Sequence, residues 1–224
     1  MMDISGQTML ARVVQRVKRS KTLNYVIIAT TKEPQDDLIV AEAKRLEIPV
    51  YRGSESDVLD RYYQAALEYK VEVVVRITSD CPLIDPELID DVVKRFIEAY
   101  PPYDYASNGL ERTYPRGLDV EVMWFKVLSC AWREAKEPYQ RVHVTPFIKE
   151  HPERFRLLSV TGGQGKELRW TVDTPEDLTF MRAVYEKFNN SDTMHWREVL
   201  DLIEREPDIA AINRHIQQKG PKEI

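Results

Sequence analysis

An α/β fold is indicated by one stretch, Val73-Val74-Val75-Arg76-Ile77-Thr78-Ser79-Asp80-Cys81-Pro82-Leu83-Ile84-Asp85-Pro86, where an apolar strand ends on an acid and a proline turn. Asp85, Pro86 and Glu87 have the residue types of a helix N-cap, a first helical position and a first-turn acid. An open α/β sheet binds ligands at the carboxyl ends of its strands. Asp80 is therefore predicted to lie where a carboxylate can hold a metal ion, although a turn acid that only caps the loop has the same pattern.

The composition predicts one soluble globular domain over residues 1–224, because 43% of the residues are hydrophobic and 31% are charged. A net charge of −5 and the lack of any five-residue basic run argue against nucleic-acid binding. No apolar run is long enough to span a membrane, and no secretion signal is evident. The two cysteines, Cys81 and Cys130, have no CxxC spacing, which favours a reducing, cytoplasmic location.

Hydrophobic periodicity predicts alternating helices and strands in the first hundred residues. Strands are expected at 25–30, 48–51 and 73–78, and helices at 9–17, 38–46, 58–67 and 88–97. This alternation predicts a Rossmann-like, mostly parallel sheet with helices on both faces. Further strands are expected at 103–107, 118–124, 157–161 and 168–171, and further helices at 126–136, 139–150 and 175–218. The segment 101–165 is predicted to be a small antiparallel insertion that binds the second substrate.

A second acid follows a predicted strand in Arg169-Trp170-Thr171-Val172-Asp173-Thr174-Pro175-Glu176-Asp177-Leu178. Thr174, Pro175 and Asp177 are explained by helix initiation and a capping box. Asp173 precedes the cap and is predicted to lie beside Asp80 at the carboxyl edge of the sheet. Two carboxylates at one crevice favour a Mg²⁺ site for a nucleoside triphosphate, although coincident turn acids are the alternative.

Three other segments give weaker signals. The loop at 51–58 carries Arg52 and Ser54, which can contact a base or phosphate but are also explained by a helix start. Asp119 and Glu121 lie two residues apart on one face of a predicted strand, which suits sugar hydroxyls or a solvated strand face. A lone histidine such as His143 is more often a structural residue than a catalyst.

Taken in order, these segments resemble the acylneuraminate and 3-deoxy-manno-octulosonate type of cytidylyltransferases, in the branch related to spore coat polysaccharide biosynthesis protein F. The matching segments are 51–63, 76–86, 116–122, 143–146 and 168–178. The resemblance implies a nucleotide-diphospho-sugar transferase fold. It also implies attack of an acidic sugar's hydroxyl on the α-phosphate of CTP, which gives a CMP-sugar and pyrophosphate for bacterial surface or spore coat polysaccharide.

The resemblance also implies roles for individual residues. Asp80 and Asp173 match the acids that hold Mg²⁺ and act in catalysis. The residues expected near the nucleotide are Arg52, Ser54 and Ser79, and those expected toward the sugar are Gly117, Asp119, Glu121 and His143. By the same resemblance, the protein is expected to be a homodimer that binds CTP and an acidic sugar, and the segment 101–165 is expected to mediate dimerisation.

Two departures from the family pattern bear on activity. Family members begin with a strand and a loop of the type Ala-Arg-x-x-Ser-x-Arg-Leu-Pro-Gly-Lys, whereas Met1–Leu10 matches the family segment immediately after that loop. Without the loop, the triphosphate charge would be left to Mg²⁺ and Arg52, and without the strand two sheet edges would be exposed. Gln140-Arg141-Val142 also replaces the acid that usually precedes the histidine. These departures leave open a non-catalytic homologue that acts as a binding or scaffolding module. A related enzyme that uses another nucleotide is the nearer alternative.

Overall fold

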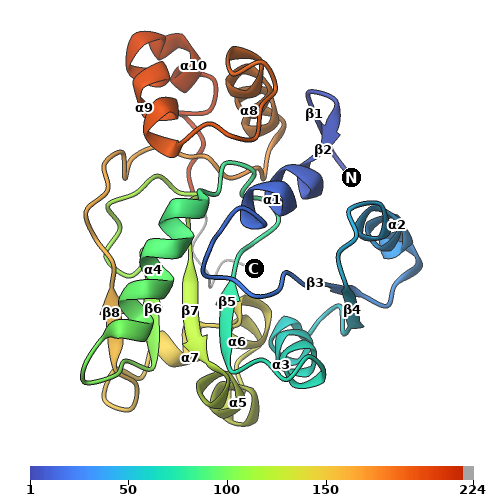
Figure 1. The fold of residues 1–224 in the computed structure, drawn as a ribbon, viewed down its shortest axis with the longest axis vertical. Helices are drawn as coiled ribbons and strands as arrows, with labels where there is room; N and C mark the ends of the chain where they lie inside the picture. Colours follow the sequence, from blue (N-terminus) through green and yellow to red (C-terminus); the bar gives the residue numbers. More distant parts are fainter. Residues whose placement is uncertain (219–224) are drawn as a thin grey trace.

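Three β-sheets are present in the structure, a computed structural model that describes residues 1–218 (Figure 1). The largest sheet has the strand order β5 (Val73–Arg76), β7 (Glu121–Trp124), β6 (Tyr105–Ser107) and β8 (Leu157–Ser159). A second sheet pairs β3 (Ile28–Thr31) with β4 (Val50–Gly53), and a small hairpin pairs β1 (Asp3–Ile4) with β2 (Gln7–Thr8).

The sheets contain both parallel and antiparallel strand pairs, and this mixed arrangement agrees with the predicted Rossmann-like α/β fold. β3 pairs parallel with β4, and β6 pairs parallel with β8. β7 pairs antiparallel with both β5 and β6, so that it alone opposes the direction of the other three strands in its sheet. The segment 101–165 supplies β6, β7 and β8 to the same sheet as β5. The segment thus contributes the antiparallel strand β7 to the main sheet, and its predicted roles in sugar binding and dimerisation stay predictions.

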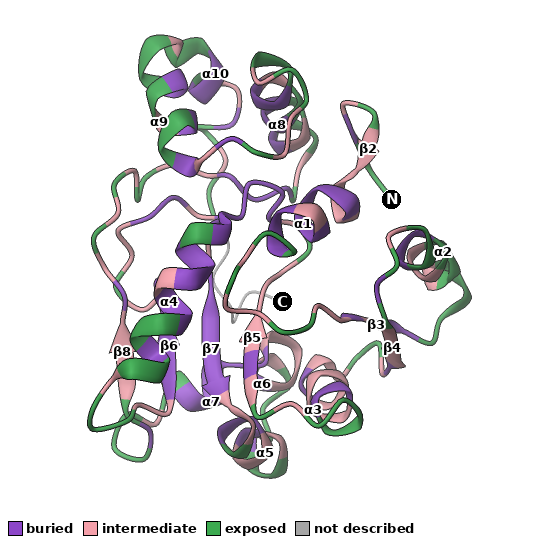
Figure 2. Cartoon of the chain, in the orientation of Figure 1, coloured by how far each residue is buried: buried purple, intermediate pink, exposed green. Residues whose placement is uncertain are grey.

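The two larger sheets are separated between β3 and β5. Within residues 1–218, β3 pairs only with β4, and β5 pairs only with β7. Val73 and Val75 of β5 are only partly buried, although the strand is entirely apolar up to Arg76 (Figure 2). Within residues 1–218, β3 and β5 therefore each lie at an edge of their sheet, with unpaired backbone groups along one side.

Helices surround the sheets. Their bounds are α1 (Met9–Val17), the short 3₁₀ helix η1 (Pro34–Asp36), α2 (Asp37–Arg45), α3 (Val58–Glu68), α4 (Pro86–Glu98), α5 (Phe125–Glu134), α6 (Pro138–His143), α7 (Pro146–Lys149), α8 (Pro175–Lys187), α9 (Trp196–Arg205) and α10 (Pro207–Ala211). None of the helices described is long and apolar enough to cross a membrane.

The predicted helix starts are confirmed. The Asp85 carboxylate accepts hydrogen bonds from the backbone N–H groups of Glu87 and Leu88 at 2.9 and 3.2 Å, which caps α4. Thr174 and Asp177 form the predicted capping box at the start of α8. The sequence therefore predicts where both helices begin, next to Asp80 and Asp173.

Two predicted elements are wrong. The expected strand at 168–171 forms only an isolated bridge between Arg116 and Arg169, because this segment pairs with a loop rather than with a strand. The expected helix at 139–150 is two helices, α6 and α7. Val144 interrupts them with a left-handed φ of 73°, and Pro146 then supplies no backbone N–H.

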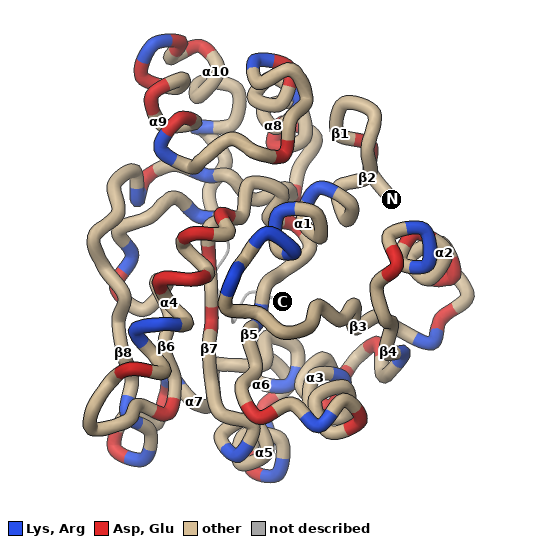
Figure 3. Tube along the Cα trace, viewed as in Figure 1, with Lys and Arg blue, Asp and Glu red and all other residues tan. Residues whose placement is uncertain are grey.

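Basic residues lie along helix α1 (Figure 3), and two of them, Arg12 and Arg16, are buried. Arg12 donates to the carbonyls of Ile4, Ser5 and Asn190, and it forms an ion pair with Asp192. Arg16, which is fully buried, donates to the carbonyls of residues 83, 84, 192 and 194. These charges therefore fasten α1 to the 190–194 segment and the turn before α4.

Candidate functional site

Asp80 is joined directly to the segment that carries Asp173. The backbone N–H of Val172 donates to the Asp80 carbonyl at 2.9 Å, and the Thr171 hydroxyl donates to the Asp80 carboxylate at 3.1 Å. Asp173 follows immediately in the chain and is exposed. The structure thus brings the two predicted acids to neighbouring segments at the end of β5.

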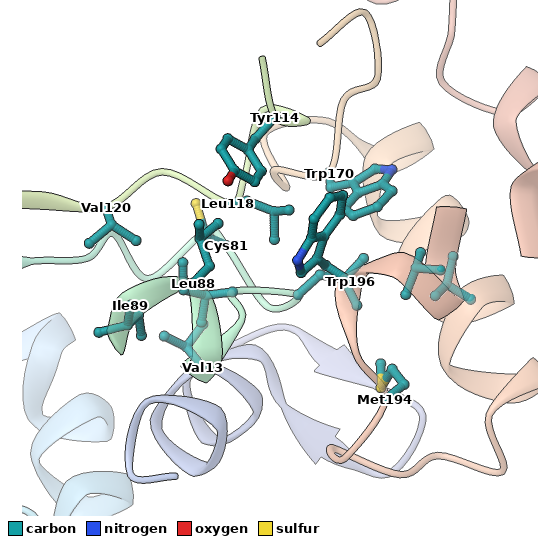
Figure 4. Close-up of a cluster of buried hydrophobic side chains, with 14 of the residues drawn as sticks. Val13, Cys81, Leu88, Ile89, Tyr114, Leu118, Val120, Trp170, Met194 and Trp196 are labelled. Atoms are coloured by element: carbon teal, nitrogen blue, oxygen red, sulfur yellow. The ribbon is translucent and has the colours of Figure 1, made fainter. Parts of the chain in front are cut away.

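The turn after Asp80 is buried and hydrogen-bonded within itself. The Ile84 N–H donates to the Cys81 carbonyl at 3.0 Å. Leu118, Val120 and Trp170 belong to the same buried hydrophobic cluster as Cys81 (Figure 4). Burial, and next the charge of Asp80, raise the pKa of the Cys81 thiol well above its ordinary value. The thiol is therefore protonated at neutral pH and is a structural group here.

Arg169 organises the other side of the site. Its guanidinium donates to Asp173 at 2.5 Å and to both carboxylate oxygens of Asp177 at 2.9 and 3.0 Å. Burial alone would raise the pKa of Asp177, but the hydrogen bonds from Arg169 and Asn213 outweigh it and lower this pKa. Asp177, itself fully buried, thereby holds Arg169 in place beside Asp173.

Gly117 and Asp119 form a tight turn against Trp170. Gly117 has a φ of +102°, and an added Cβ would lie 2.4 Å from the Trp170 carbonyl carbon and oxygen. One carboxylate oxygen of Asp119 accepts from the Gly117 N–H at 2.9 Å, and the other accepts from Arg112 at 2.5 Å. The glycine is therefore required for the close approach of the 109–119 loop to the 168–173 segment.

Glu121 follows this turn as the first residue of β7, and it is buried. Its carboxylate accepts from Arg76 and Tyr105 at 2.5 Å each, from Thr145 at 2.7 Å and from Lys149 at 3.4 Å. Burial would raise the pKa of Glu121, but the charge of Arg76 outweighs it and the pKa falls to about 2. With both oxygens occupied, Glu121 stabilises the β5–β7 pair. A direct contact with a sugar stays a prediction that this geometry does not favour.

The loop predicted to contact a nucleotide is also internally bonded. Arg52 donates to the carbonyls of Thr31 and Glu33 and to the carboxylate of Asp37 at 2.7 Å. The Ser54 hydroxyl accepts from the Asp57 N–H at 3.0 Å. The cap of α3 is Asp57, whose carboxylate accepts from the Asp60 N–H at 2.8 Å, so the alternative in which Ser54 caps the helix is wrong. The structure assigns both side chains to loop stabilisation, and their contact with a nucleotide stays a prediction.

Ser79 and His143 lie in different surroundings. Ser79 is exposed directly before Asp80, where its hydroxyl is accessible to a ligand. His143 ends α6, and its carbonyl accepts from the Thr145 N–H at 2.9 Å. Thr145 also donates to Glu121, so the backbone of His143 adjoins the buried network around Glu121. Its expected role toward a sugar also stays a prediction.

A family model described as "Cytidylyltransferase" matches residues 1–213. The chain belongs to the cytidylyltransferase family. The match covers every element that forms the site, from α1 to the 168–173 segment. This places the protein among nucleotidyltransferase enzymes and agrees with the resemblance found in the sequence.

Individual cytidylyltransferase relatives agree with this assignment. The chain is 30% identical to the spore coat polysaccharide biosynthesis protein SpsF of Bacillus subtilis, over 92% of this chain and 88% of that protein. It is 32% identical to a 3-deoxy-manno-octulosonate cytidylyltransferase of Anaeromyxobacter dehalogenans, over 81% of this chain and 88% of that protein. A solved cytidylyltransferase structure from Leptospira borgpetersenii superposes with a TM-score of 0.90 at 29% identity, covering 98% of this chain and 91% of that chain.

The donor set of this cytidylyltransferase fits a magnesium ion bound together with a substrate. Asp80 and Asp173 supply two carboxylates at one edge, whereas no group of three or more His, Cys, Asp or Glu residues suited to a metal occurs within residues 1–218. Mg²⁺ is usually held by one or two carboxylates, with water and substrate phosphates completing its shell. The Asp173 side chain is 47% exposed, so it can reach such an ion.

Sequence reasoning missed the arginines that shape this cytidylyltransferase site. Arg112 and Arg169 hold Asp119 and Asp173, and Arg76 holds Glu121. Arg76 carried a readable signal, because a charged residue inside an apolar strand requires a buried partner. Arg112 and Arg169 had none, since their partners become neighbours only through loop geometry.

Proposed function

We propose that this cytidylyltransferase transfers CMP from CTP to a hydroxyl of an acidic sugar and releases pyrophosphate, for bacterial surface or spore coat polysaccharide synthesis. The observation that carries the proposal is the hydrogen bond from Val172 to Asp80, which sets Asp80 and Asp173 at one edge. The similarity to SpsF and to a 3-deoxy-manno-octulosonate cytidylyltransferase supports the substrate class.

The reaction forms one bond and breaks another at the α-phosphorus of CTP. The sugar oxygen bonds to this phosphorus, its proton is released to solvent, and the bond to the β-phosphate oxygen breaks. Asp80 and Asp173 would hold Mg²⁺, which when bound offsets phosphate charge and aligns the groups for in-line displacement. Arg169 keeps the Asp173 carboxylate in position, and the Thr171 hydroxyl does the same for Asp80.

The remaining predicted residues differ in how accessible their side chains are to a ligand. Ser79 is the exposed residue before Asp80 and is proposed to contact the nucleotide, whereas Arg52 and Ser54 shape the neighbouring loop. The Gly117–Asp119 turn is proposed to face the sugar. Glu121 and His143 are proposed to support this turn from the side away from the sugar. In this arrangement the nucleotide and sugar meet at the carboxyl end of β5.

A homodimer in the cytoplasm is part of the proposal. β8 forms an open edge of the larger sheet, which supports an interface made by the middle strands. Size-exclusion chromatography with light scattering is expected to give twice the monomer mass. A monomer at micromolar concentration would contradict this part alone.

The proposed reaction is tested by pyrophosphate release from CTP with Mg²⁺ and a panel of acidic sugars, using protein expressed from its complete reading frame. Asp80→Asn and Asp173→Asn are expected to lower kcat at least about 100-fold, because a metal ligand is lost. Asp91→Asn is the matched control, since Asp91 is partly exposed on α4 and forms an ion pair with Arg95 on the same helix. Metal-dependent turnover that survives both site substitutions would show that the two acids do not hold the ion.

No observation in the described residues or the relatives favours the binding-module alternative. A protein that binds CTP without releasing pyrophosphate for any sugar in the panel would support that alternative.

A further inference from the structure

The main chain of Arg116 is hydrogen-bonded to the 168–170 segment of the site. Its N–H donates to the Leu168 carbonyl at 3.0 Å, and its own carbonyl accepts from the Trp170 N–H at 2.6 Å. The next residue is Gly117, which has no room for a side chain against Trp170. The Cα of Arg116 is therefore held against the 168–170 segment by main-chain contacts alone.

Arg116 differs from the arginines beside it in lacking a carboxylate partner. Arg112 forms an ion pair with Asp119, and Arg169 forms ion pairs with Asp173 and Asp177. The Arg116 side chain makes no hydrogen bond or ion pair with any residue in the described range 1–218, although it is half-buried. Five N–H donors are thus left without a protein acceptor in a partly desolvated position.

The charges around Arg116 also disfavour an unpaired guanidinium at this position. Burial, and next the repulsion of Arg112, lower the pKa of Arg116, and the nearby Asp119 and Asp173 do not offset these effects. An arginine remains positively charged at neutral pH despite such a shift. The group is therefore a partly buried cation that an incoming anion would stabilise.

We propose that Arg116 binds the carboxylate of the acidic sugar and thereby selects acidic over neutral sugars. This inference rests on the proposed function, because it names the sugar contact of the same site. The planar guanidinium matches a carboxylate with two parallel hydrogen bonds. A neutral sugar would leave the guanidinium unpaired when the site fills, and such a loss discriminates strongly between substrates.

A phosphate of CTP is the competing anion. Arg116 directly precedes the Gly117–Asp119 turn, which is the segment proposed to face the sugar. The phosphates are proposed to meet Asp80 and Asp173 through Mg²⁺. The position of Arg116 in the chain therefore favours the sugar carboxylate, and separate binding measurements distinguish the two anions.

The test is isothermal titration calorimetry on the wild type, Arg116→Gln, Arg116→Lys and Arg95→Gln. The probes are CTP alone and three carboxylate sugars, 3-deoxy-manno-octulosonate, N-acetylneuraminate and glucuronate, each with saturating CDP and Mg²⁺. Arg95→Gln is the matched control, because Arg95 is exposed on α4. Arg116→Gln is expected to weaken the binding of the sugar that the wild type prefers by about 10- to 100-fold and to leave CTP affinity within about twofold.

Each other outcome has a defined meaning. If Arg116→Gln weakens CTP more than the sugar, or leaves sugar binding unchanged, the inference is wrong while the proposed function stands. If the wild type binds CTP but none of the three carboxylates, the inference is likewise wrong. If it binds neither CTP nor any sugar, the proposed function fails as well. Circular dichroism checks folding, and if Arg116→Gln does not fold, Arg116→Lys is expected to show about a tenfold loss because lysine keeps the charge without the planar fork.

Discussion

Arg76 and Glu121 are direct register partners on β5 and β7, and their side chains form a buried ion pair with 2.5 Å between Nη1 and Oε2. Arg76 ends β5, just before the turn that carries Asp80. Glu121 begins β7, the strand that follows the Gly117–Asp119 turn. This ion pair therefore joins the strand that leads to Asp80 to the strand that follows the Gly117–Asp119 turn.

Glu121→Gln is expected to lower the free energy of unfolding by about 3 kcal/mol, because the buried Arg76 charge would lose its counter-ion. Urea denaturation measures this change. Glu134→Gln is the control, since Glu134 pairs with Arg154 at the surface and its loss is expected to have little effect. Equal destabilisation by the two substitutions would contradict the importance of burial.

The contribution of Glu121 to stability should depend on pH. Its pKa is lowered from the ordinary value of 4.5 to about 2, because the Arg76 charge outweighs the effect of burial. A lowered pKa stabilises the fold fully above pH 4.5, and this stabilisation is lost as pH falls toward 2. The difference in unfolding free energy between wild type and Glu121→Gln should therefore be smaller at pH 3 than at pH 6. A difference that stays constant over this interval would refute the assignment.

Gly117→Ala should destabilise the protein more than Gly6→Ala does. Both glycines have a left-handed φ, +102° and +87°, so alanine is strained at each position. Only at Gly117 would the added carbon also meet a backbone carbonyl, whereas nothing lies within 4 Å at Gly6. We expect an extra cost of about 1–3 kcal/mol in thermal or urea unfolding. Similar losses at both positions would mean that the 168–173 segment moves aside easily.

The two cysteines should differ in their reaction with iodoacetamide. Cys81 is 3% exposed, whereas Cys130 is partly accessible on α5. Burial is the first cause of a raised pKa at both thiols, and the shift is large at Cys81. Mass spectrometry at pH 8 should find modification at Cys130 alone in the native protein and at both residues in urea. Rapid modification of native Cys81 would show that the turn after β5 opens.

Local signals in the sequence predicted the elements that border the site. Asp85-Pro86-Glu87 begins α4 and Thr174-Pro175 begins α8, because capping chemistry involves residues only a few positions apart. The proximity of the Asp80 and Asp173 segments was also predicted from the rule that an α/β sheet collects the ends of its strands at one edge. That reason holds for Asp80 after β5, whereas the segment before Asp173 is no strand and is joined to Asp80 by the Val172 N–H.

Side-chain partners across long stretches of chain were not predictable. Glu121 reads as half of an exposed pair with Asp119, yet its partner Arg76 lies 45 positions earlier in the chain. Arg52 reads as a free ligand contact, yet the 31–37 segment occupies its donors. In both cases the pattern gives the residue type, while the tertiary contact decides whether the side chain remains available to a substrate.

The hydrogen bonds between Asp80 and the 171–172 segment can form only late in protein synthesis, because the two segments are far apart in the chain. Thr171 follows Asp80 by 91 positions, so at about 5–20 residues per second a ribosome needs roughly 5–20 s to make the intervening chain. During that interval the nascent protein has β5 and its acid but no second wall for the site. Substrate can thus stabilise folding only in its final phase, after the 168–173 segment has left the ribosome.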